Sequence, residues 1–429
     1  MFVLILFLIS FFDGTKYGES IYIVGMQEPD PYISDFENIR EYFFRPLDPE
    51  ITMTPADLIK SKGYPYENYE VTTEDGFVLQ LHRIPFGKKR NNASNLKASV
   101  YLQHGLLCTS CDFLMNLENQ SLAFIMADND LDVWLGDTRG NKYSRKHIKY
   151  TTNDTEFWDW SFDEIAKYDL PAVIDFIIKV TNRDHLYYVG HSQGSMVALA
   201  HFSQNPEMSN KVKMFFAMAP VAYLKNIRSP IRLFAPITQT YEIASRMFGR
   251  KEFLPSNHMV QWIAMSVCPY GISLKVCSHM LYLIGGPYTG NFNESRIPVI
   301  YGHYPAGTSV RNIAHFGQSI RTGDFRKYDY GFFKNLIKYG KYIPPSYDVT
   351  QMTIPTMIFW GLKDLLAVPK DVKKLIPLIQ NLVGNYKSYN SNHFDFVFGI
   401  NAAKEYYSVI IQAILDTEFN SSFKKTNNS

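Results

Sequence analysis

A serine at position 192 stands between two glycines in the pentapeptide Gly-His-Ser-Gln-Gly, which covers residues 190–194. The apolar residues 186–189 before it predict a β-strand, and residues 195–202 after it predict an α-helix. A sharp turn between a strand and a helix crowds its neighbours, so glycines must flank a serine whose hydroxyl group is exposed there. We therefore expect Ser192 to be a nucleophile rather than part of a plain glycine-rich turn. The residues expected to shape this nucleophile elbow are Gly190, His191 and Gly194.

A histidine and a carboxylate must accompany such a serine, because its hydroxyl group is a good nucleophile only when an imidazole accepts its proton. Around a turn of this kind both partners follow the serine in the chain. Six of the eleven histidines lie after Ser192, and only His393 follows a late predicted strand. Asp364 directly follows the strand predicted over residues 356–360, so we expect it to orient the imidazole. Asp395 is the competing acid, but it lies two residues from His393, and we expect a capping or salt-bridge role for it.

An anionic tetrahedral intermediate also needs backbone N–H groups that point at its oxygen atom. One is expected from Gln193, which follows the nucleophile. The other is expected from Leu106, in the sequence His-Gly-Leu-Leu that follows a strand predicted over residues 100–103. Gly105 permits close approach there, and we expect His104 to order the loop rather than to transfer protons. These assignments include no metal ligand and no cofactor.

The elements that would position these residues alternate between strands and helices, which indicates a mostly parallel sheet covered on both faces. A β-hairpin is expected over residues 69–83. The alternation breaks between residues 223 and 348, so we expect an insertion there between two strands of a discontinuous core. The other predicted strands cover residues 100–103, 132–135, 186–189, 213–218, 356–360 and 386–389. The predicted helices cover residues 55–61, 121–127, 162–179, 195–202, 369–380 and 402–414.

An apolar run covers residues 2–12 at the N-terminus. It is too short to cross a bilayer as a helix, which takes about 20 residues, and it fits the apolar region of a signal peptide over residues 1–18. A buried strand or a signal anchor is the alternative, because no basic residue precedes the run and no clear cleavage site follows it. Sequons at Asn92, Asn119, Asn153, Asn293, Asn420 and Asn427 support the secretory pathway. No later apolar stretch is long enough to span a membrane, so we expect a soluble mature protein.

The composition is that of a folded protein with a large core, since 46% of the 429 residues are hydrophobic and 20% are charged. Lysine and arginine total 43 and aspartate and glutamate 41, so the net charge is +2. The chain therefore lacks the basic surplus typical of nucleic-acid-binding proteins. Four cysteines are too few for a disulfide scaffold. The sequence gives no clear signal of oligomerisation, and a monomer is the default expectation.

Eight stretches together form a pattern that is more specific than the serine pentapeptide alone. They cover residues 63–76, 102–107, 132–141, 162–172, 188–194, 305–309, 363–367 and 392–396. In these stretches the chain resembles the acid lipases, the family that contains gastric lipase and lysosomal acid lipase. The resemblance runs from about residue 50 to about residue 415.

This resemblance implies an α/β-hydrolase core over residues 45–222 and 349–418, with an inserted, mainly helical cap and lid over residues 223–348. It also implies hydrolysis of triacylglycerols or steryl esters at a lipid–water interface, often at acidic pH and without a metal. An extracellular or lysosomal location would follow. The family's catalytic triad and oxyanion donors fall on the residues reached above, which are Ser192, Asp364, His393, Leu106 and Gln193.

The cysteines follow the family's pattern only in part. Cys268 and Cys277 match its disulfide spacing within the cap, whereas a third cap cysteine of many members falls near Gly285 and is absent. Cys108 and Cys111 follow the His-Gly-Leu-Leu loop, where the family usually has no cysteines, and they either bond to each other or stay free. A zinc or redox site at this Cys-x-x-Cys is not expected, because no second pair of ligands lies nearby.

Residues 254–286 are rich in apolar side chains, which we expect mostly to pack the core of a helical cap. Some of them would face an acyl-binding cleft or a lipid surface. These residues are Met259, Val260, Trp262, Ile263, Met265, Val267, Leu281, Tyr282, Leu283 and Ile284. Two other functions stay open: hydrolysis of a thioester or a small soluble ester, and lipid binding by a catalytically silent relative.

Overall fold

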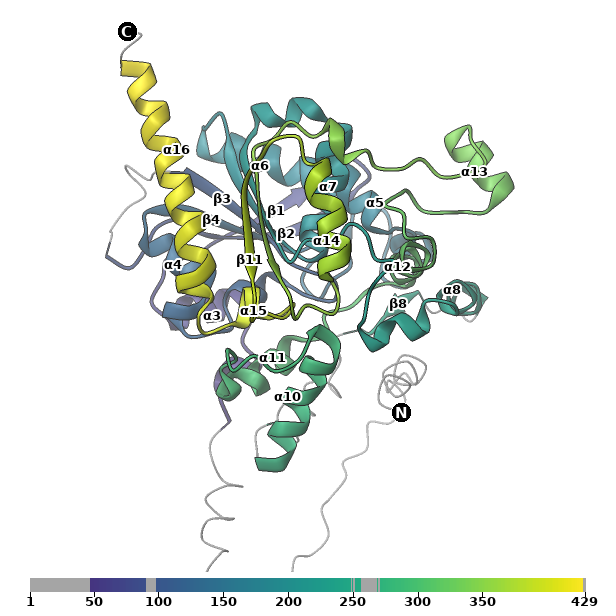
Figure 1. Ribbon diagram of the computed structural model, residues 1–429, viewed down its shortest axis with the longest axis horizontal. Coiled ribbons are helices and arrows are strands. Elements are labelled where there is room, and N and C mark those ends of the chain that lie inside the picture. Colours follow the sequence, from purple (N-terminus) through teal and green to yellow (C-terminus); the bar gives the residue numbers. More distant parts are fainter. Residues whose placement is uncertain are drawn as a thin grey trace, which may run out of the picture.

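The computed structural model describes residues 47–89, 98–247, 249, 251–255, 268 and 271–426 (Figure 1). The expected signal peptide over residues 1–18 lies outside the described residues, as do the sequons Asn92 and Asn427. The same holds for the first six of the apolar lid residues, Met259, Val260, Trp262, Ile263, Met265 and Val267. None of the described helices combines the length and the apolar character needed to cross a membrane.

A nine-stranded sheet forms the centre of the molecule, in the order β1-β2-β4-β3-β6-β7-β10-β11, with β5 paired to β2. Strands β1 and β2 pair antiparallel, and so do β2 and β4, whereas every pair from β4 to β11 is parallel. The loops that follow the parallel strands therefore meet at one edge of the sheet. In chain order the strands are β1 (Glu67–Thr72), β2 (Phe77–Ile84), β3 (Ala98–Gln103), β4 (Leu131–Gly136), β5 (Lys146–His147), β6 (Leu186–His191), β7 (Val212–Met218), β10 (Thr356–Gly361) and β11 (Leu382–Ser388).

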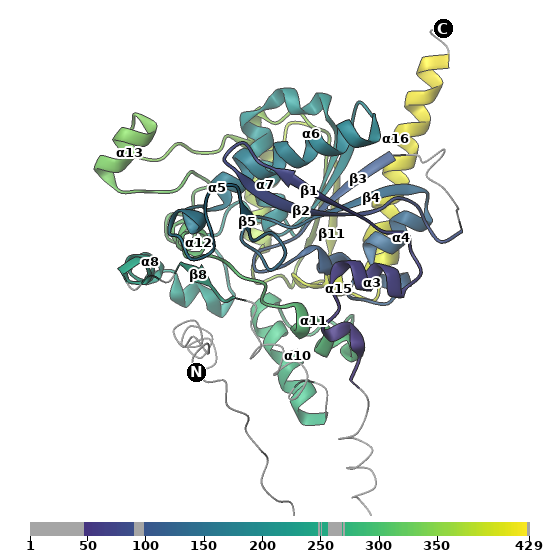
Figure 2. The same cartoon turned by 180° about the vertical axis from the view of Figure 1, so that it is seen from behind.

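Helices lie on both faces of the sheet, with α4 and α16 on one side and α6, α7 and α14 on the other (Figures 1 and 2). Every residue of β3, β4 and β6 is buried, as expected for short apolar strands that are covered on both faces. The expected parallel, two-faced architecture is therefore present. The helices of this part are α3 (Pro55–Ser61), α4 (Leu122–Asp128), α5 (Phe162–Glu164), α6 (Leu170–Thr181), α7 (Gln193–Gln204), α14 (Pro369–Leu375), α15 (Asp395–Phe398) and α16 (Ser408–Thr426).

Three of the predicted helices differ from the observed ones. The helix expected over 162–179 is divided by a π-helical turn at Ile165–Asp169, and the one expected over 402–414 begins with a π-helical turn and extends to Thr426. The helix expected over 369–380 ends at Leu375, because Pro377 has no N–H to continue the α-helical hydrogen bonds.

The last predicted strand begins earlier than expected, because β11 starts at Leu382 rather than at residue 386. It lies at the edge of the sheet, where its residues alternate between half-buried and exposed. Gly384 interrupts the apolar pattern near the start of β11, so the strand signal is weak there.

Residues 223–348 are inserted between β7 and β10, as the break in alternation predicted. Helix α12 packs against α8, while α13 stands away from the rest of the molecule (Figure 1). The division into a core over 45–222 and 349–418 and a cap over 223–348 stays a prediction. The elements of the insertion are η8 (Pro230–Phe234), α8 (Thr238–Met247), β8 (Glu252–Phe253), α10 (Gly271–Gly285), η9 (Glu294–Arg296), α11 (Ile297–His303), β9 (Thr308–Ser309), α12 (Val310–Thr322) and α13 (Phe332–Tyr339).

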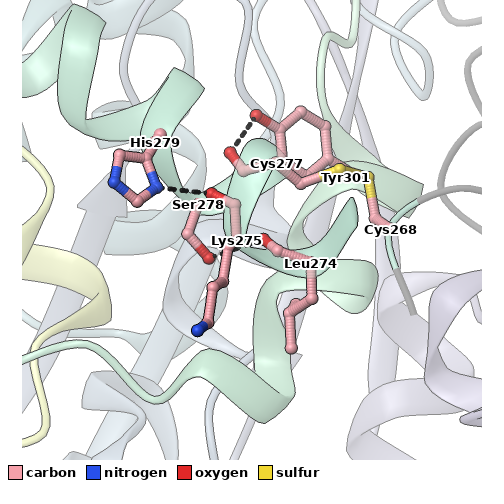
Figure 3. Close-up of a disulfide and its surroundings, with 7 residues drawn as sticks. All are labelled: Cys268, Leu274, Lys275, Cys277, Ser278, His279 and Tyr301. Atoms are coloured by element: carbon pink, nitrogen blue, oxygen red, sulfur yellow. Dashed lines mark hydrogen bonds between the residues drawn. A yellow bond between two sulfur atoms is a disulfide. The ribbon is translucent and has the colours of Figure 1, made fainter. Parts of the chain in front are cut away.

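The disulfide that the resemblance implied joins Cys277 of α10 to Cys268, which precedes this helix in the chain (Figure 3). The Tyr301 hydroxyl group of α11 donates a hydrogen bond to the Cys277 carbonyl oxygen at 2.9 Å. Of the lid residues at the end of α10, Leu281 and Tyr282 are buried, Ile284 is half-buried and Leu283 is exposed. Which of them line an acyl-binding cleft stays a prediction.

The sequons that the structure describes differ in exposure. Asn119, Asn153 and Asn420 are exposed, and Asn293 is half-buried. The side chain of Asn293 caps η9 by accepting a hydrogen bond from the Ser295 N–H group. Glycosylation of these residues stays a prediction.

Candidate active site

Ser192 occupies a tight turn between β6 and α7, with φ 54° and ψ −117°. This is a left-handed conformation that costs a non-glycine residue free energy and persists only where the surroundings enforce it. A Cβ atom at Gly190 would lie 2.7 Å from the carbonyl carbon of Gly194, and one at Gly194 would overlap the carbonyl oxygen of Gln103. The two glycines therefore allow β6, the turn and β3 to approach one another, as the sequence predicted for a nucleophile elbow.

The structure brings Ser192, His393 and Asp364 together in one chain of hydrogen bonds. The Ser192 hydroxyl group lies 2.8 Å from His393 Nε2, and His393 Nδ1 lies 2.8 Å from Asp364 Oδ2. Asp364 is 1% exposed and His393 2%, whereas Ser192 is half-buried and so remains accessible. Such an arrangement lets the imidazole take the serine proton while the carboxylate holds the opposite ring nitrogen.

The turn after β10 fixes the Asp364 carboxylate from its other side. Oδ1 accepts hydrogen bonds from the N–H groups of Leu366 and Ala367, both at 2.8 Å. Because one oxygen atom is held by the backbone, the other is left to bind the imidazole.

The loops that carry Asp364 and His393 also meet at a residue of the insertion. The carbonyl oxygen of Gly285, at the end of α10, accepts hydrogen bonds from the N–H groups of Leu365 and His393, each at 3.1 Å. Sequence reasoning did not find this contact, because Gly285 carries no side chain and lies about a hundred residues away in the chain. The insertion thus helps to hold two members of the triad.

Asp395, the competing acid, does not contact His393 through its carboxylate. Its Oδ2 atom accepts a hydrogen bond from the Asn392 N–H group at 2.7 Å, and its Oδ1 atom accepts one from the Thr289 hydroxyl group at 3.0 Å. Burial raises the pKa of Asp395 to about 6. Its contacts are those of a residue that orders the turn around His393, which agrees with the expected capping role.

His104 and Gly105 form the loop that follows β3, beside the elbow. The His104 Nε2 atom accepts a hydrogen bond from the Thr138 N–H group at 3.1 Å, so its Nδ1–H group donates to the Gly105 carbonyl oxygen at 2.8 Å. Burial lowers the pKa of His104, which keeps its ring neutral. These contacts give His104 the ordering role that the sequence predicted.

The two expected oxyanion donors lie at the start of α7 and in this loop. Gln193 is the first residue of α7, and its backbone N–H group is one that no preceding turn of the helix uses. Its side chain is buried, and Oε1 accepts a hydrogen bond from Asn312 of α12 at 2.8 Å. Asn312 was missed by sequence reasoning, since nothing in the sequence links α12 to the elbow. Leu106 directly follows Gly105, whose Cβ atom would lie 3.2 Å from the Ser192 Cβ atom.

His191, which precedes the nucleophile, is buried behind the triad. Its Nε2–H group donates to the His393 carbonyl oxygen at 3.0 Å. Burial, with a smaller contribution from the charge of His393, lowers the pKa of His191 to about 3, so it stays neutral. It therefore supports the His393 loop and does not compete as a base.

Cys108 and Cys111 are buried free thiols, which answers the question that the sequence left open. Burial raises the pKa of Cys111 to about 12 and that of Cys108 well above its ordinary value, so both stay protonated. Within the described ranges, no cluster of three or more histidine, cysteine, aspartate or glutamate side chains could hold a metal ion.

Comparison with known proteins gives this site a family context. A family profile described as "alpha/beta hydrolase fold" matches residues 98–399, and one described as "partial alpha/beta-hydrolase lipase region" matches residues 55–117. Gastric triacylglycerol lipase of Homo sapiens is 44% identical over 86% of this chain and 92% of its own. Lysosomal acid lipase/cholesteryl ester hydrolase of Homo sapiens is 41% identical over 85% of this chain and 91% of its own.

A solved structure from Sulfolobus solfataricus has the same fold, with a TM-score of 0.54 at 14% sequence identity, over 86% of this chain and 97% of that one. The expected α/β-hydrolase fold is therefore confirmed. The fold profile covers well over half of the chain, and the two human relatives exceed 40% identity over most of it. The chain belongs to the acid lipase family of α/β hydrolases.

Proposed function

We propose that this protein is a serine ester hydrolase that cleaves lipid esters, namely triacylglycerols or steryl esters, through an acyl-enzyme intermediate. The observation that carries this proposal is the continuous chain of hydrogen bonds from Ser192 through His393 to Asp364, each 2.8 Å long. A buried, oriented imidazole beside a half-buried serine in a strained turn has a direct use in acyl transfer.

In the proposed reaction, Ser192 Oγ attacks the ester carbonyl carbon while His393 Nε2 takes the hydroxyl proton. Asp364 holds the opposite ring nitrogen and stabilises the imidazolium. The N–H groups of Gln193 and Leu106 donate to the oxyanion. His393 then gives its proton to the leaving alcohol as the C–O bond breaks, which leaves the acyl group on Ser192. Water, activated by His393, releases the fatty acid and restores the serine.

Lipid esters are the proposed substrates for two reasons. Two relatives are named as a triacylglycerol lipase and a cholesteryl ester hydrolase. The insertion also exposes large apolar side chains, which suit contact with a lipid–water interface. Those on η8, α8 and α10, and between η8 and α8, are Leu233, Ile237, Ile243, Val276 and Leu283.

The apolar run at residues 2–12 and the sequons support the secretory pathway, with an extracellular or lysosomal destination. Action at acidic pH is proposed from the resemblance to the acid lipases alone. We further propose that the protein acts as a monomer, with residues 223–348 as its cap and lid.

The test is hydrolysis of emulsified triolein and of cholesteryl oleate between pH 4 and pH 8, with wild type and Ser192→Ala side by side. We expect fatty acid release by the wild type, with a loss of at least about a thousandfold in the variant. A folded wild type that hydrolyses neither emulsion but cleaves 4-nitrophenyl butyrate would instead support a soluble-ester hydrolase. No hydrolysis of any ester would support a silent lipid binder.

A further inference from the structure

A cluster of three polar side chains lies behind the loop that holds Leu106; Asp112 and Cys108 are buried and Tyr304 is half-buried. Asp112, from η3 (Ser110–Phe113), is 1% exposed, and its Oδ1 atom accepts a hydrogen bond from the Tyr304 hydroxyl group at 2.5 Å. The thiol of Cys108 donates to the Leu106 carbonyl oxygen at 3.1 Å. Tyr304 follows α11, so the cluster joins the inserted segment to the loop after β3.

The loop itself is strained and needs such support. Leu107 has a positive φ of 61°, a left-handed conformation that costs a residue with a Cβ atom about 1–2 kcal/mol. Its carbonyl oxygen accepts a hydrogen bond from the Ala306 N–H group at 2.8 Å, and the Ala306 carbonyl oxygen accepts one from Lys142 at 3.0 Å. Residues 304–306 therefore hold the loop by its backbone at Leu107 and reach Asp112 through Tyr304.

Gly105 connects this cluster to the nucleophile. A Cβ atom there would lie 3.2 Å from Ser192 Cβ on one side and 3.3 Å from Cys108 Sγ on the other. The cluster and the nucleophile thus pack against opposite sides of the same backbone. A change in the charge or position of the cluster would therefore shift the backbone that donates to the oxyanion.

Burial of Asp112 favours the neutral form of its carboxyl group. Among the described residues, no group forms a hydrogen bond with its Oδ2 atom and none forms an ion pair with its carboxylate. Burial raises the pKa of Asp112 to about 7, although Tyr304, Cys108 and nearby backbone groups favour the ionised form. An orphaned oxygen atom is tolerated better on a neutral carboxyl group than on a buried anion.

The titratable groups on the neighbouring elements are also compatible with a neutral Asp112. Tyr304, from the end of α11, and Cys108 both have pKa values raised well above the ordinary range, and so stay neutral. Asp137, which follows β4, is held by Ser110 on η3 at 2.8 Å and 2.9 Å. His104, at the end of β3, is kept neutral by burial, and Asp395 of α15 is bound to Asn392 and Thr289.

We propose that Asp112 is a positioning residue for the oxyanion loop, whose neutral carboxyl group, with Tyr304 and Cys108, holds Gly105–Leu107 in place for the reaction. Ionisation of Asp112 would put a negative charge behind the loop at which the oxyanion develops, and so would weaken transition-state stabilisation. This inference rests on the proposed hydrolase function and deepens it by naming a group that regulates the same site.

The pH dependence of catalysis follows from this arrangement. Activity should fall as pH rises through about 7, where Asp112 ionises. The descending limb is therefore assigned to a residue outside the triad.

The experiment measures kcat/KM for soluble 4-nitrophenyl butyrate from pH 5 to pH 9, so that a lipid interface does not affect the profile. Active sites are counted with an organophosphonate. We expect Asp112→Asn, which keeps the shape without the charge, to lose the descending limb and to exceed the wild type at pH 8.5 by about tenfold, relative to their values at pH 6. Tyr304→Phe should have a lower kcat and a limb moved to higher pH, because the Tyr304 hydroxyl group stabilises the ionised carboxylate.

Asp163→Asn is the matched control. Asp163 is also a buried carboxyl group, with a pKa raised to about 6 and a hydrogen bond from the Tyr347 hydroxyl group at 2.5 Å, and it has no contact with the loop in the described structure. Its substitution should leave the limb unchanged. An unchanged limb in Asp112→Asn, or an equal shift in Asp163→Asn, would overturn the inference. If Asp112→Asn does not fold, an unshifted limb in Tyr304→Phe would overturn it as well. A wild type without hydrolysis at any pH would instead contradict the proposed function, and this inference with it.

Discussion

At the scale of single residues, the site depends on how completely the Asp364 carboxylate is oriented. Two backbone N–H groups, from Leu366 and Ala367, bind one oxygen atom, so only the other faces His393. The imidazole therefore carries its proton on Nδ1 and leaves Nε2 free to accept the proton of Ser192. The backbone N–H groups that bind Asp364 therefore determine the tautomer of the His393 imidazole.

Asp364→Asn tests this orientation. The asparagine carbonyl oxygen can keep the hydrogen bonds from Leu366 and Ala367, which turns its NH₂ group towards His393. The imidazole would then carry its proton on Nε2 and could not accept the proton of Ser192. We expect kcat to fall by about ten-thousandfold with little change in KM, as measured by ester hydrolysis at saturating substrate. A fall of less than tenfold, in a variant with the wild-type melting temperature, would contradict this role.

The triad could be predicted from the sequence because chain order and neighbouring strands narrow the choice. The triad residues lie in the turns or loops after β6, β10 and β11, and the apolar runs of β6 and β10 are visible in the sequence. Gly285, Asn312 and Tyr304 could not be found in this way. They act through contacts between the insertion and the loops of the sheet, more than a hundred residues apart for Asn312 and Tyr304, and no local pattern marks such contacts.

At the scale of elements, the end of α10 determines how the loops after β10 and β11 lie. Gly286 follows α10 with φ 137°, and a Cβ atom there would overlap the Lys363 carbonyl oxygen and lie 2.8 Å from Asn392 Cβ. Lys363 precedes Asp364 and Asn392 precedes His393. A glycine is therefore needed where the insertion passes between the two loops.

Gly286→Ala tests this dependence, with Gly290→Ala as its control. Both glycines have positive φ, but a Cβ atom at Gly290 would meet nothing within 4 Å. We expect Gly286→Ala to separate the two loops and to lower kcat at least about tenfold, which corresponds to about 1.4 kcal/mol of transition-state stabilisation. Gly290→Ala should keep kcat and lose only some thermal stability. Equal kcat values in the two variants would rule out a role of this contact in catalysis.

Most elements were predicted to within a few residues, and the errors have physical causes. Buried parallel strands are short apolar runs, so they were found. The edge strand β11 and the ends of α14 and α16 were misplaced. Gly384 interrupts the apolar pattern at the start of β11, and Pro377 ends the α-helical hydrogen bonds of α14. A π-helical turn precedes α16, whose extension to Thr426 no feature of the apolar pattern marks.

At the scale of the whole molecule, buried carboxyl groups and buried histidines have opposite effects on how the free energy of unfolding changes with pH. Carboxyl groups with raised pKa values lose their contribution to the free energy of unfolding as pH rises from about 4 to about 7. Buried histidines with lowered pKa values lose theirs as pH falls from about 6.5 towards 4, because the unfolded chain takes up the proton first. These carboxyl groups include Asp112, with a pKa of about 7, and Asp163 and Asp395, with pKa values of about 6. The histidines include His191, with a pKa of about 3, and His201, His303 and His315, with pKa values of about 4.

Between pH 4.5 and pH 6, the carboxyl groups lower the free energy of unfolding as pH rises, and the histidines raise it. We therefore expect a melting temperature that changes by only about 3 °C over this window, measured by calorimetry at constant ionic strength. Asp163→Asn removes one contribution that falls with pH, so the melting temperature of that variant should rise more steeply with pH than that of the wild type. A wild-type melting temperature that changes steadily by about 10 °C or more would show that the balance does not exist.

The arrangement of the insertion over the site is what the sequence could least predict at this scale. The break in alternation located residues 223–348, but it did not show that α10, α11 and α12 reach the loops of the triad and of the oxyanion donors. These contacts arise from folding of the whole chain. The resemblance to acid lipases supplied the overall architecture, and the contacts themselves required the structure.

The most direct test of the central claim is to find where an organophosphonate ester attaches to the protein. The phosphorus atom reacts with an activated serine, and digestion followed by mass spectrometry locates the adduct. We expect one phosphonate per molecule, on Ser192, and no labelling of His393→Gln, in which no imidazole accepts the serine proton. Labelling of another residue, equal labelling of His393→Gln, or no labelling of the folded wild type would contradict it.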